Sequence, residues 1–195
     1  MNKLCLRRSG AVVAVGLGLL LGPAVPARAT PTPELRQVGA TAVVYQGPQV
    51  DVAVSYRFAK LSPKGSWLLL DTSMTSAADP VEIVRGAIEV RTPTGEVVPL
   101  ASQEDFNQDY HLLAASIARA NVTREPMNYL LPHRYRPMRL FADRRLGVVF
   151  QSVWLDSRHD DLGRLYFRLP GGVQKGSYEL LIKLAKGDVV IPFVI

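Results

Sequence analysis

The chain is poor in the residues on which many enzymes and disulfide-rich domains depend. Its 195 residues include one cysteine and three histidines. A single cysteine cannot form an internal disulfide, so the fold must be held by its hydrophobic core. The sequence has no standard zinc-ligand spacing, no Gly-x-Ser-x-Gly motif and no glycine-rich phosphate loop. These absences exclude the familiar signatures of zinc enzymes, of that class of serine hydrolase and of nucleotide-binding proteins. We expect no cofactor.

Long apolar stretches are also missing, apart from one run near the N-terminus. Residues 11–22 are apolar or glycine, whereas roughly twenty residues are needed to span a bilayer. Three basic residues precede this run, and Ala27 and Ala29 follow it at the positions of a cleavage site. We predict that residues 1–29 are a cleaved secretory signal peptide and that no transmembrane span remains after processing. The protein is then an exported bacterial protein, periplasmic or secreted.

The excess of positive charge belongs largely to this signal. The whole chain carries 23 basic and 17 acidic side chains. Residues 1–29 hold four of the basic side chains and none of the acidic ones, so 19 basic and 17 acidic side chains remain, a net charge of +2. A charge this small gives no general attraction for nucleic acid, and the compartment also argues against it. We therefore expect no nucleic-acid partner.

The rest of the chain alternates apolar and polar residues with a period of two, which is typical of half-buried strands. The pattern is clearest in residues 50–59. Further strands are predicted at 66–76, 81–92, 146–155, 164–169, 177–185 and 189–195. Eight to ten short strands separated by turns predict a mostly β fold, an antiparallel β-sandwich.

We predict a single domain over residues 41–195, preceded by a loosely ordered lead at 30–40. Its strands carry large apolar side chains that we expect to form one interior between two sheets. These side chains are Trp67, Leu69, Phe150, Trp154 (or its neighbours Val153 and Leu155), Tyr166 and Leu180.

Residues 102–120 interrupt the strand pattern. Four apolar side chains recur there at helical spacing: Phe106, Tyr110, Leu113 and Ile117. Ser102 and Asp105 have the spacing of a capping box. We predict one amphipathic helix, inserted between the two halves of the sandwich, with its apolar stripe packed on the core. The helix and an irregular, arginine-rich crossover together occupy residues 102–145.

Two stretches resemble an immunoglobulin-like β-sandwich domain of exported bacterial proteins of unknown function. The first, GSWLLLDTSMTSAADPVEIVRGAIEVRTPTGEVVPL, is similar to the opening half of that domain, and GRLYFRLPGGVQKGSYELLIKL is similar to its closing half. The resemblance covers roughly residues 50–100 and 146–195. It implies an immunoglobulin-like sandwich and supplies no catalytic residues. The helix and the arginine-rich crossover depart from the family pattern, so any feature particular to this protein is expected there.

Arginine is concentrated in the stretch PHRYRPMRLFADRR, residues 132–145. Residues 124–168 contain nine arginines and five acidic side chains, a net charge of +4, whereas the rest of the mature chain has a net charge of −2. The planar guanidinium suits carboxylate, phosphate and sulfate groups. If the stretch is a binding surface, we expect its partner to be an anionic envelope component or an acidic protein. The candidate binding residues are Arg134, Tyr135, Arg136, Arg139, Arg144 and Arg145. Alternatively, these arginines pair internally with Asp143, Asp156, Asp160 and Asp161.

The segment DSRHDD, residues 156–161, is the densest cluster of acidic residues with a histidine. Its ionisable members suit a weak metal site or acid–base chemistry together with His133: Asp156, His159, Asp160 and Asp161. Polar, aspartate-rich segments are also usual in hairpin turns, and a turn is our prediction for 156–163. Convergence of the two histidines and the aspartates on one concave pocket would favour catalysis, whereas scatter would argue against it.

The sequence as a whole favours a non-enzymatic binding or assembly module of the cell envelope. The alternative is a hydrolase or metal-dependent enzyme that uses the Asp156–Asp161 turn with His133. A third hypothesis is a purely structural accessory domain of a larger envelope complex.

Overall fold

A computed structural model describes residues 32–63, 65–142 and 147–195 of the chain. Two groups that the sequence singled out lie outside the described residues: the predicted signal peptide at 1–29, and Asp143 with Arg144 and Arg145. Within the described ranges, no helix combines the length and the apolar character needed to cross a membrane.

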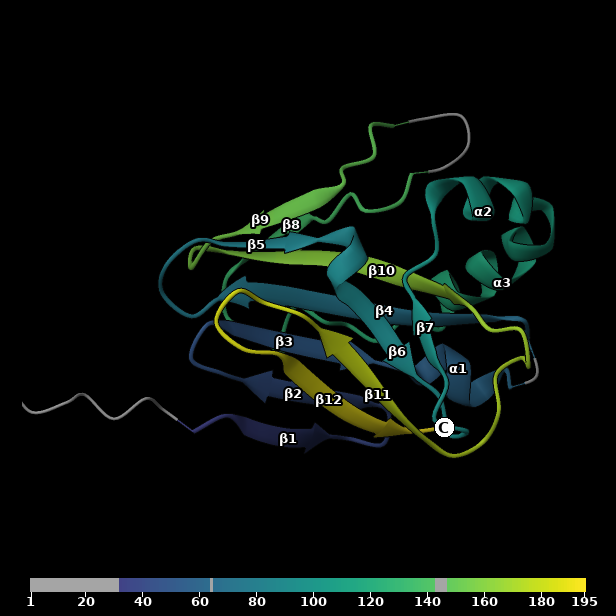
Figure 1. The fold of residues 1–195 in the computed structure, drawn as a ribbon, viewed down its shortest axis with the longest axis horizontal. Helices are drawn as coiled ribbons and strands as arrows, with labels where there is room; N and C mark the ends of the chain where they lie inside the picture. Colours follow the sequence, from purple (N-terminus) through teal and green to yellow (C-terminus); the bar gives the residue numbers. More distant parts are fainter. Residues whose placement is uncertain (1–31, 64, 143–146) are drawn as a thin grey trace, which may run out of the picture.

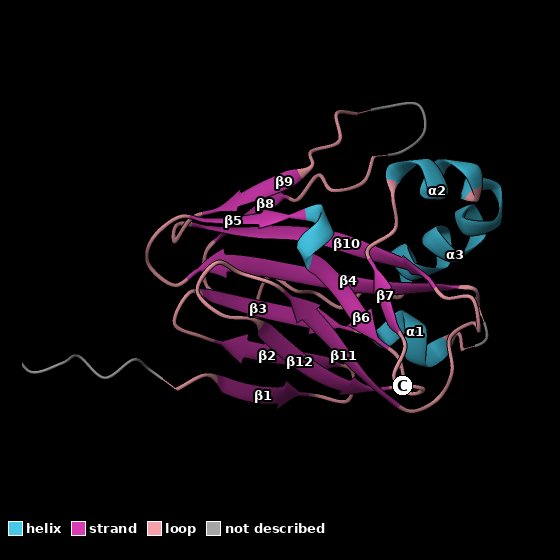
Figure 2. Ribbon diagram, in the orientation of Figure 1, coloured by secondary structure: helices cyan, strands magenta, loops and turns pink. Residues whose placement is uncertain are grey.

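Most of the protein is β-structure, as the sequence predicted (Figures 1 and 2). The larger sheet has the strand order β1-β2-β3-β4-β10-β8. Strand β8 runs parallel to β10, and the other neighbouring strands of this sheet are antiparallel. The bounds are β1 Glu34–Val38, β2 Ala42–Gln46, β3 Val50–Ser55, β4 Trp67–Ser76, β8 Arg134–Pro137 and β10 His159–Arg168.

A smaller sheet and a two-stranded ribbon cover one face of the larger sheet (Figure 1). The smaller sheet has the order β12-β11-β6-β7, and the ribbon consists of β5 and β9. All three contribute to one buried cluster, with Leu68 and Phe167 from the larger sheet, Leu180 from the smaller sheet, and Ile83 and Leu155 from the ribbon. This confirms the predicted sandwich. The bounds are β5 Val81–Val84, β6 Ile88–Arg91, β7 Val97–Pro99, β9 Ser152–Leu155, β11 Ser177–Ile182 and β12 Val189–Val194.

The inserted helical segment is two helices instead of the single helix predicted. The predicted capping box is present, because Ser102 Oγ accepts the backbone N–H of Asp105 at 2.9 Å. The helix is interrupted at Asp109, whose carboxylate accepts Trp67 Nε1–H at 3.2 Å and pairs with Arg168 Nε at 3.2 Å. These contacts to the sheet fix the residue at the interruption. The helices are α1 Arg57–Leu61, α2 Gln103–Gln108 and α3 Tyr110–Val122.

A second buried cluster lies on the opposite face of the larger sheet, beneath the helices. It joins Trp67, Leu69 and Tyr166 from the sheet to Phe106 and Leu113 from α2 and α3. The predicted single interior is therefore wrong for these three sheet residues, because successive side chains of a strand face opposite sides. It is also wrong for Phe150, which is 47% exposed. Of the alternatives predicted for β9, Leu155 lies in the core, with Val153 packed against it, whereas Trp154 is 60% exposed.

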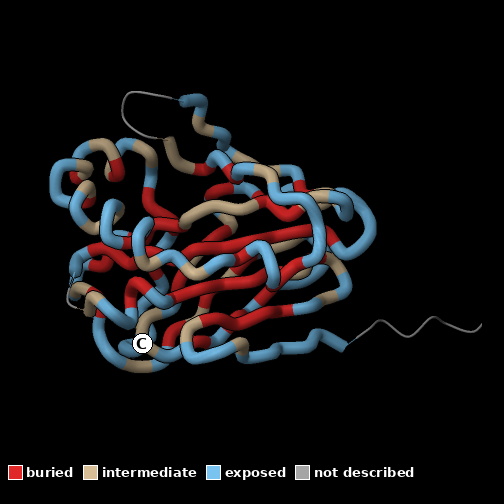
Figure 3. Tube along the Cα trace, turned by 180° about the vertical axis from the view of Figure 1, so that it is seen from behind, coloured by how far each residue is buried: buried red, intermediate tan, exposed pale blue. Residues whose placement is uncertain are grey.

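Four segments differ from their predicted local structure. The predicted lead contains strand β1, an edge strand that buries none of its residues, whereas the central strands are buried (Figure 3). The predicted irregular crossover contains β8, and the strand predicted at 146–155 is confined to β9. Strand β10 begins inside the predicted polar turn, and Asp160 and Asp161 are buried in it. Tertiary partners for these two aspartates account for the last difference.

Candidate functional site

Strand β8 places three of the predicted binding residues at the edge of the larger sheet. Its register with β10 sets Tyr135 opposite Asp160 and Arg136 opposite Asp161. Because side chains alternate between the two faces of a sheet, Tyr135 and Arg136 point to opposite sides. Tyr135 is exposed. The predicted binding residues therefore do not form one continuous group.

Arg136 is held by two carboxylates and one backbone carbonyl. Its Nε and Nη2 donate to the two oxygens of Asp161 at 2.8 and 2.6 Å, and its Nη1 donates to Asp156 Oδ2 at 3.1 Å. Nη2 also donates to the carbonyl oxygen of Trp154 at 2.9 Å. The hydrogen bond to Asp161 raises the pKa of Arg136. This side chain joins β8, β9 and β10, so the internal pairing left open by the sequence holds for Arg136.

Arg134 and Arg139 differ from Arg136. Both side chains belong to exposed residues, and in the described part of the chain neither forms an ion pair. Arg139 is fixed beside Phe150, because the N–H of Phe150 donates to the carbonyl oxygen of Arg139 at 2.9 Å. These two arginines remain accessible to an anionic group.

Asp156 is the acidic centre of a small network on the ribbon side of β10. Burial tends to raise its pKa, but the N–H of Arg158, the hydrogen bond of His159 and the charges of His159 and Arg136 lower it to about 2. The Oδ1 of Asp156 lies 3.0 Å from Nδ1 of His159. Asp156 therefore stabilises the fold in its charged form.

Replacing Asp156 with asparagine is expected to reduce stability at neutral pH and to have a diminishing effect in acid. Its folded-state pKa of about 2 lies below the ordinary 3.8, so its contribution is present above pH 4 and is lost as pH falls towards 2. Thermal midpoints of both proteins, measured between pH 2 and pH 7, should converge at the acidic end. The exposed Asp188 supplies the control Asp188→Asn. A constant difference over the whole range would contradict the assigned role.

The histidines and aspartates named as a catalytic alternative form two separate pairs. The backbone N–H of His133 donates to Asp160 Oδ2 at 2.9 Å, and the imidazole Nδ1 of His133 lies 3.0 Å from Asp160 Oδ1. His159 pairs instead with Asp156. Asp160 and Asp161 are consecutive in β10 and so face opposite sides of the sheet. Across residues 32–63, 65–142 and 147–195, no three histidine or acidic side chains are grouped for binding a metal ion.

The ribbon presents an exposed aromatic face that the sequence analysis did not find. In its register Trp154 lies opposite Glu82, and Ser152 opposite Val84. These four side chains share the outer face of the ribbon, whereas Ile83 and Leu155 face the core. The ribbon lies along the edge of the molecule that is remote from β1 (Figure 1). In the sequence, strand alternation shows only that Trp154 and Leu155 face opposite sides. It does not say which of the two is buried.

Two hollows lie on either side of Trp154. The first, which we name the arginine hollow, has a volume of about 420 Å³ and is lined by Arg136, Arg139, Phe150 and Trp154. The second, the turn hollow, has a volume of about 440 Å³ and is lined by Trp154, Glu82 and Val84 of the ribbon together with turns at 48–49, 78–80 and 183–186. Both volumes fall within the range of small-ligand sites. We name Glu82, Val84, Arg139, Phe150 and Trp154, with these two hollows, the Trp154 surface.

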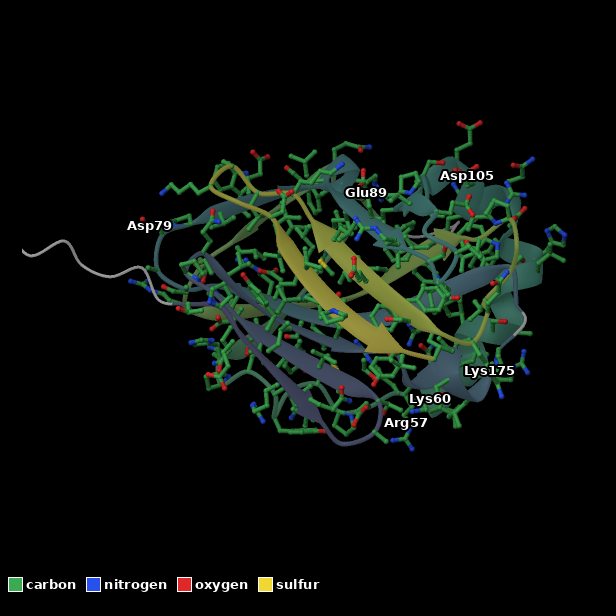
Figure 4. All side chains as sticks on the ribbon, turned by 60° about the horizontal axis from the view of Figure 1, so that its bottom comes forward. Arg57, Lys60, Asp79, Glu89, Asp105 and Lys175 are labelled. Carbon is green, nitrogen blue, oxygen red and sulfur yellow. The ribbon has the colours of Figure 1, made fainter. Side chains whose placement is uncertain are left out.

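The wall of the turn hollow is formed by turns from both sheets. Gln49 Nε2, in the turn before β3, donates to the carbonyl oxygen of Gly187 before β12 at 3.4 Å. Asp79, at the turn between β4 and β5 and labelled in Figure 4, also lines this hollow and is exposed. Lys186 lines it too and is exposed. The hollow is thus a feature of the assembled sandwich and is not contained in any single sequence motif.

Comparison with known proteins found no matching family model, no similar curated protein and no similar solved structure.

Proposed function

We propose that the protein is an exported, non-enzymatic binding module of the cell envelope, and that the Trp154 surface is its binding site. The observation that carries the proposal is the 60% exposure of Trp154 on a paired strand, between two hollows. Tryptophan and arginine are the residues most enriched at the energetic centres of protein interfaces. The immunoglobulin-like relationship of the sandwich belongs to the same proposal and rests on the sequence resemblance.

The apolar part of this surface supports a binding role. Phe150, Trp154 and Val84 expose 47%, 60% and 47% of their area within one region. Exposed apolar residues scattered singly need no explanation, but a group beside hollows is typical of an interaction site. Covering such side chains with a partner removes apolar surface from water, which favours association.

The charges support an anionic group on the partner, as the sequence analysis expected. Arg139 and Arg134 carry guanidinium groups without an acidic partner in the described ranges. Arg136 is held in position by its ion pairs with Asp161 and Asp156, so this side of the surface has a fixed shape. An anionic envelope component or an acidic protein segment fits these free cations. The catalytic alternative has less support, because its two histidines pair with different aspartates, His133 with Asp160 and His159 with Asp156.

The proposal predicts that the double variant Trp154→Ala with Arg139→Gln loses binding while it keeps its fold. Protein from the producing cell, wild type or variant, is immobilised and exposed to envelope extract, and retained components are identified by mass spectrometry. We expect at least one component to be retained by the wild type and lost by the variant. Because exposed charges are screened beyond about 8–10 Å, added salt should also weaken retention by the wild type.

The matched control is Leu112→Ala with Arg119→Gln, which changes an exposed apolar side chain and an exposed arginine on α3. This control should retain the same component as the wild type. Equal retention by wild type, Trp154 variant and control would refute the Trp154 surface as the binding site. Melting curves of all three proteins exclude unfolding as the cause of a loss.

A further inference from the structure

We infer that the ligand of the Trp154 surface is an extended polypeptide segment with an apolar side chain between an acidic and a basic residue. The inference rests on the proposed binding role of this surface and goes further by naming the ligand class and its charge order. Its acidic residue lies towards Arg139, and its basic residue lies towards Glu82 and Asp79.

The two hollows differ in the sign of their unpaired charges. In the arginine hollow, Asp161 neutralises Arg136, and Arg139 has no acidic partner among the described residues. In the turn hollow, Asp79 and Glu82 are exposed and form no ion pair within the described residues. The surface is therefore positive on one side of Trp154 and negative on the other.

The lysines of the turn hollow do not cancel this difference. Lys183 Nζ lies 2.6 Å from Glu89 Oε1, so its charge is balanced by Glu89 and not by Asp79 or Glu82. Lys186 is exposed and opposes two unpaired acids, Asp79 and Glu82, which leaves a net charge of −1. The turn hollow thus suits a cationic group.

The ligand has to be extended, because Trp154 lines both hollows. Glu82 lies directly opposite Trp154 in the ribbon and lines the turn hollow with it, whereas Arg139 lines the arginine hollow with Trp154. A ligand that contacts both charges must pass over the indole face, where an apolar group is the favoured contact. A polypeptide in an extended conformation presents every second side chain to one surface, so residues of different character at positions i, i+2 and i+4 can follow such a path.

Charge complementarity separates a polypeptide from a polyanion. An acidic glycan or an anionic lipid surface would satisfy Arg139 but would bring like charges to Asp79 and Glu82. Juxtaposed like charges disfavour the wrong partner and set register more than they add affinity. Polypeptides are the ligand class in which carboxylates and ammonium or guanidinium groups alternate along one chain.

The test uses a phage-displayed library of random peptides, selected on the whole protein recovered from the producing cell. Selection on wild type, with Trp154→Ala as the counter-selected variant, should enrich sequences with an apolar residue between an acidic and a basic residue. Selected peptides are then synthesised and titrated by tryptophan fluorescence. Because Trp67 is buried and Trp154 is exposed, a change in emission reports the Trp154 surface.

Charge-reversed variants decide the order of charges. Glu82→Lys should weaken the binding of a selected peptide about fivefold to tenfold. A peptide whose basic residue is changed to glutamate should bind this variant with restored affinity. Arg139→Glu should weaken the same peptide, and its affinity should recover when the acidic residue of the peptide is changed to lysine. The control Glu104→Lys reverses an exposed acid on α2, away from both hollows, and should leave affinity unchanged.

Polygalacturonate serves as the polyanion probe in the same titration. Binding of polygalacturonate in preference to every selected peptide, lost in Trp154→Ala, would overturn the polypeptide inference and leave the proposed binding function standing. Enrichment of uniformly acidic peptides would overturn the charge order. If no peptide is enriched on wild type over Trp154→Ala, the polypeptide inference fails. The envelope-extract comparison then decides separately whether the proposed binding function fails as well.

Discussion

Truncating Trp67 to alanine is expected to lower the free energy of unfolding by about 3–5 kcal/mol. The side chain is 6% exposed and lies between β4 and the helices, in the cluster that contains Phe106 and Leu113. Its removal leaves a cavity beneath α2 and α3, and it also deprives Asp109 of the hydrogen bond from Nε1. Urea unfolding monitored by circular dichroism measures the loss.

Two variants separate the cavity from the hydrogen bond. Trp67→Phe keeps most of the apolar volume and loses the bond to Asp109, so a smaller cost of about 1–2 kcal/mol is expected. Leu112→Ala removes an exposed apolar side chain from α3, which packs over Trp67, and should change the free energy of unfolding by less than about 0.5 kcal/mol. Equal losses for Trp67→Ala and Leu112→Ala would mean that the helices do not pack on the sheet through Trp67.

The helical insertion illustrates how far local sequence can predict this fold. The apolar stripe and the spacing of Ser102 and Asp105 are local signals, and both the helical character and the capping box are confirmed. The interruption at Asp109 is set by Trp67, 42 residues away, which no local pattern encodes. The two clusters on opposite faces of the larger sheet follow the strand alternation. Alternation alone does not say that helices cover the second face.

The arginine-rich crossover illustrates the opposite case, in which local signals were misleading. Three prolines in 122–145 predicted irregular chain, yet Arg134–Pro137 forms a strand at the sheet edge, where proline is tolerated. Asp160 and Asp161 were predicted in a turn because polar, aspartate-rich segments are usual in hairpin turns, yet both are buried in β10. Their partners, His133 and Arg136, come from that same crossover.

The candidate site was only partly accessible from sequence for a related reason. Arg136 and Arg139 were among the predicted binding residues, and they do line one hollow. Trp154 was predicted for the core with Val153 and Leu155 as alternatives, because strand alternation does not say which face is buried, and Glu82 carried no signal. Both become recognisable only when the β5–β9 pairing sets them side by side.

Replacing Arg136 with glutamine is expected to destabilise the protein by about 3 kcal/mol, at the lower end of the range for a broken buried ion pair. The side chain of Asp161 is 2% exposed and would lose the partner of both its oxygens, whereas Arg136 itself is 39% exposed and partly screened by water. The change also removes the links from β8 to Asp156 and to the carbonyl oxygen of Trp154. Urea unfolding at neutral pH measures the loss.

Arg139→Gln is the matched control, since Arg139 lines the same hollow and forms no ion pair in the described part of the chain. Its unfolding free energy should stay within about 0.5 kcal/mol of wild type. Adding Asp161→Asn to Arg136→Gln removes the stranded charge and should recover at least half of the loss, because most of the cost is an unpaired buried carboxylate. Equal effects of Arg136→Gln and Arg139→Gln would mean that Arg136 is no more internally paired than its neighbour. In that case both arginines would belong to the binding face, and Trp154 would be held in position only by the pairing of β5 with β9.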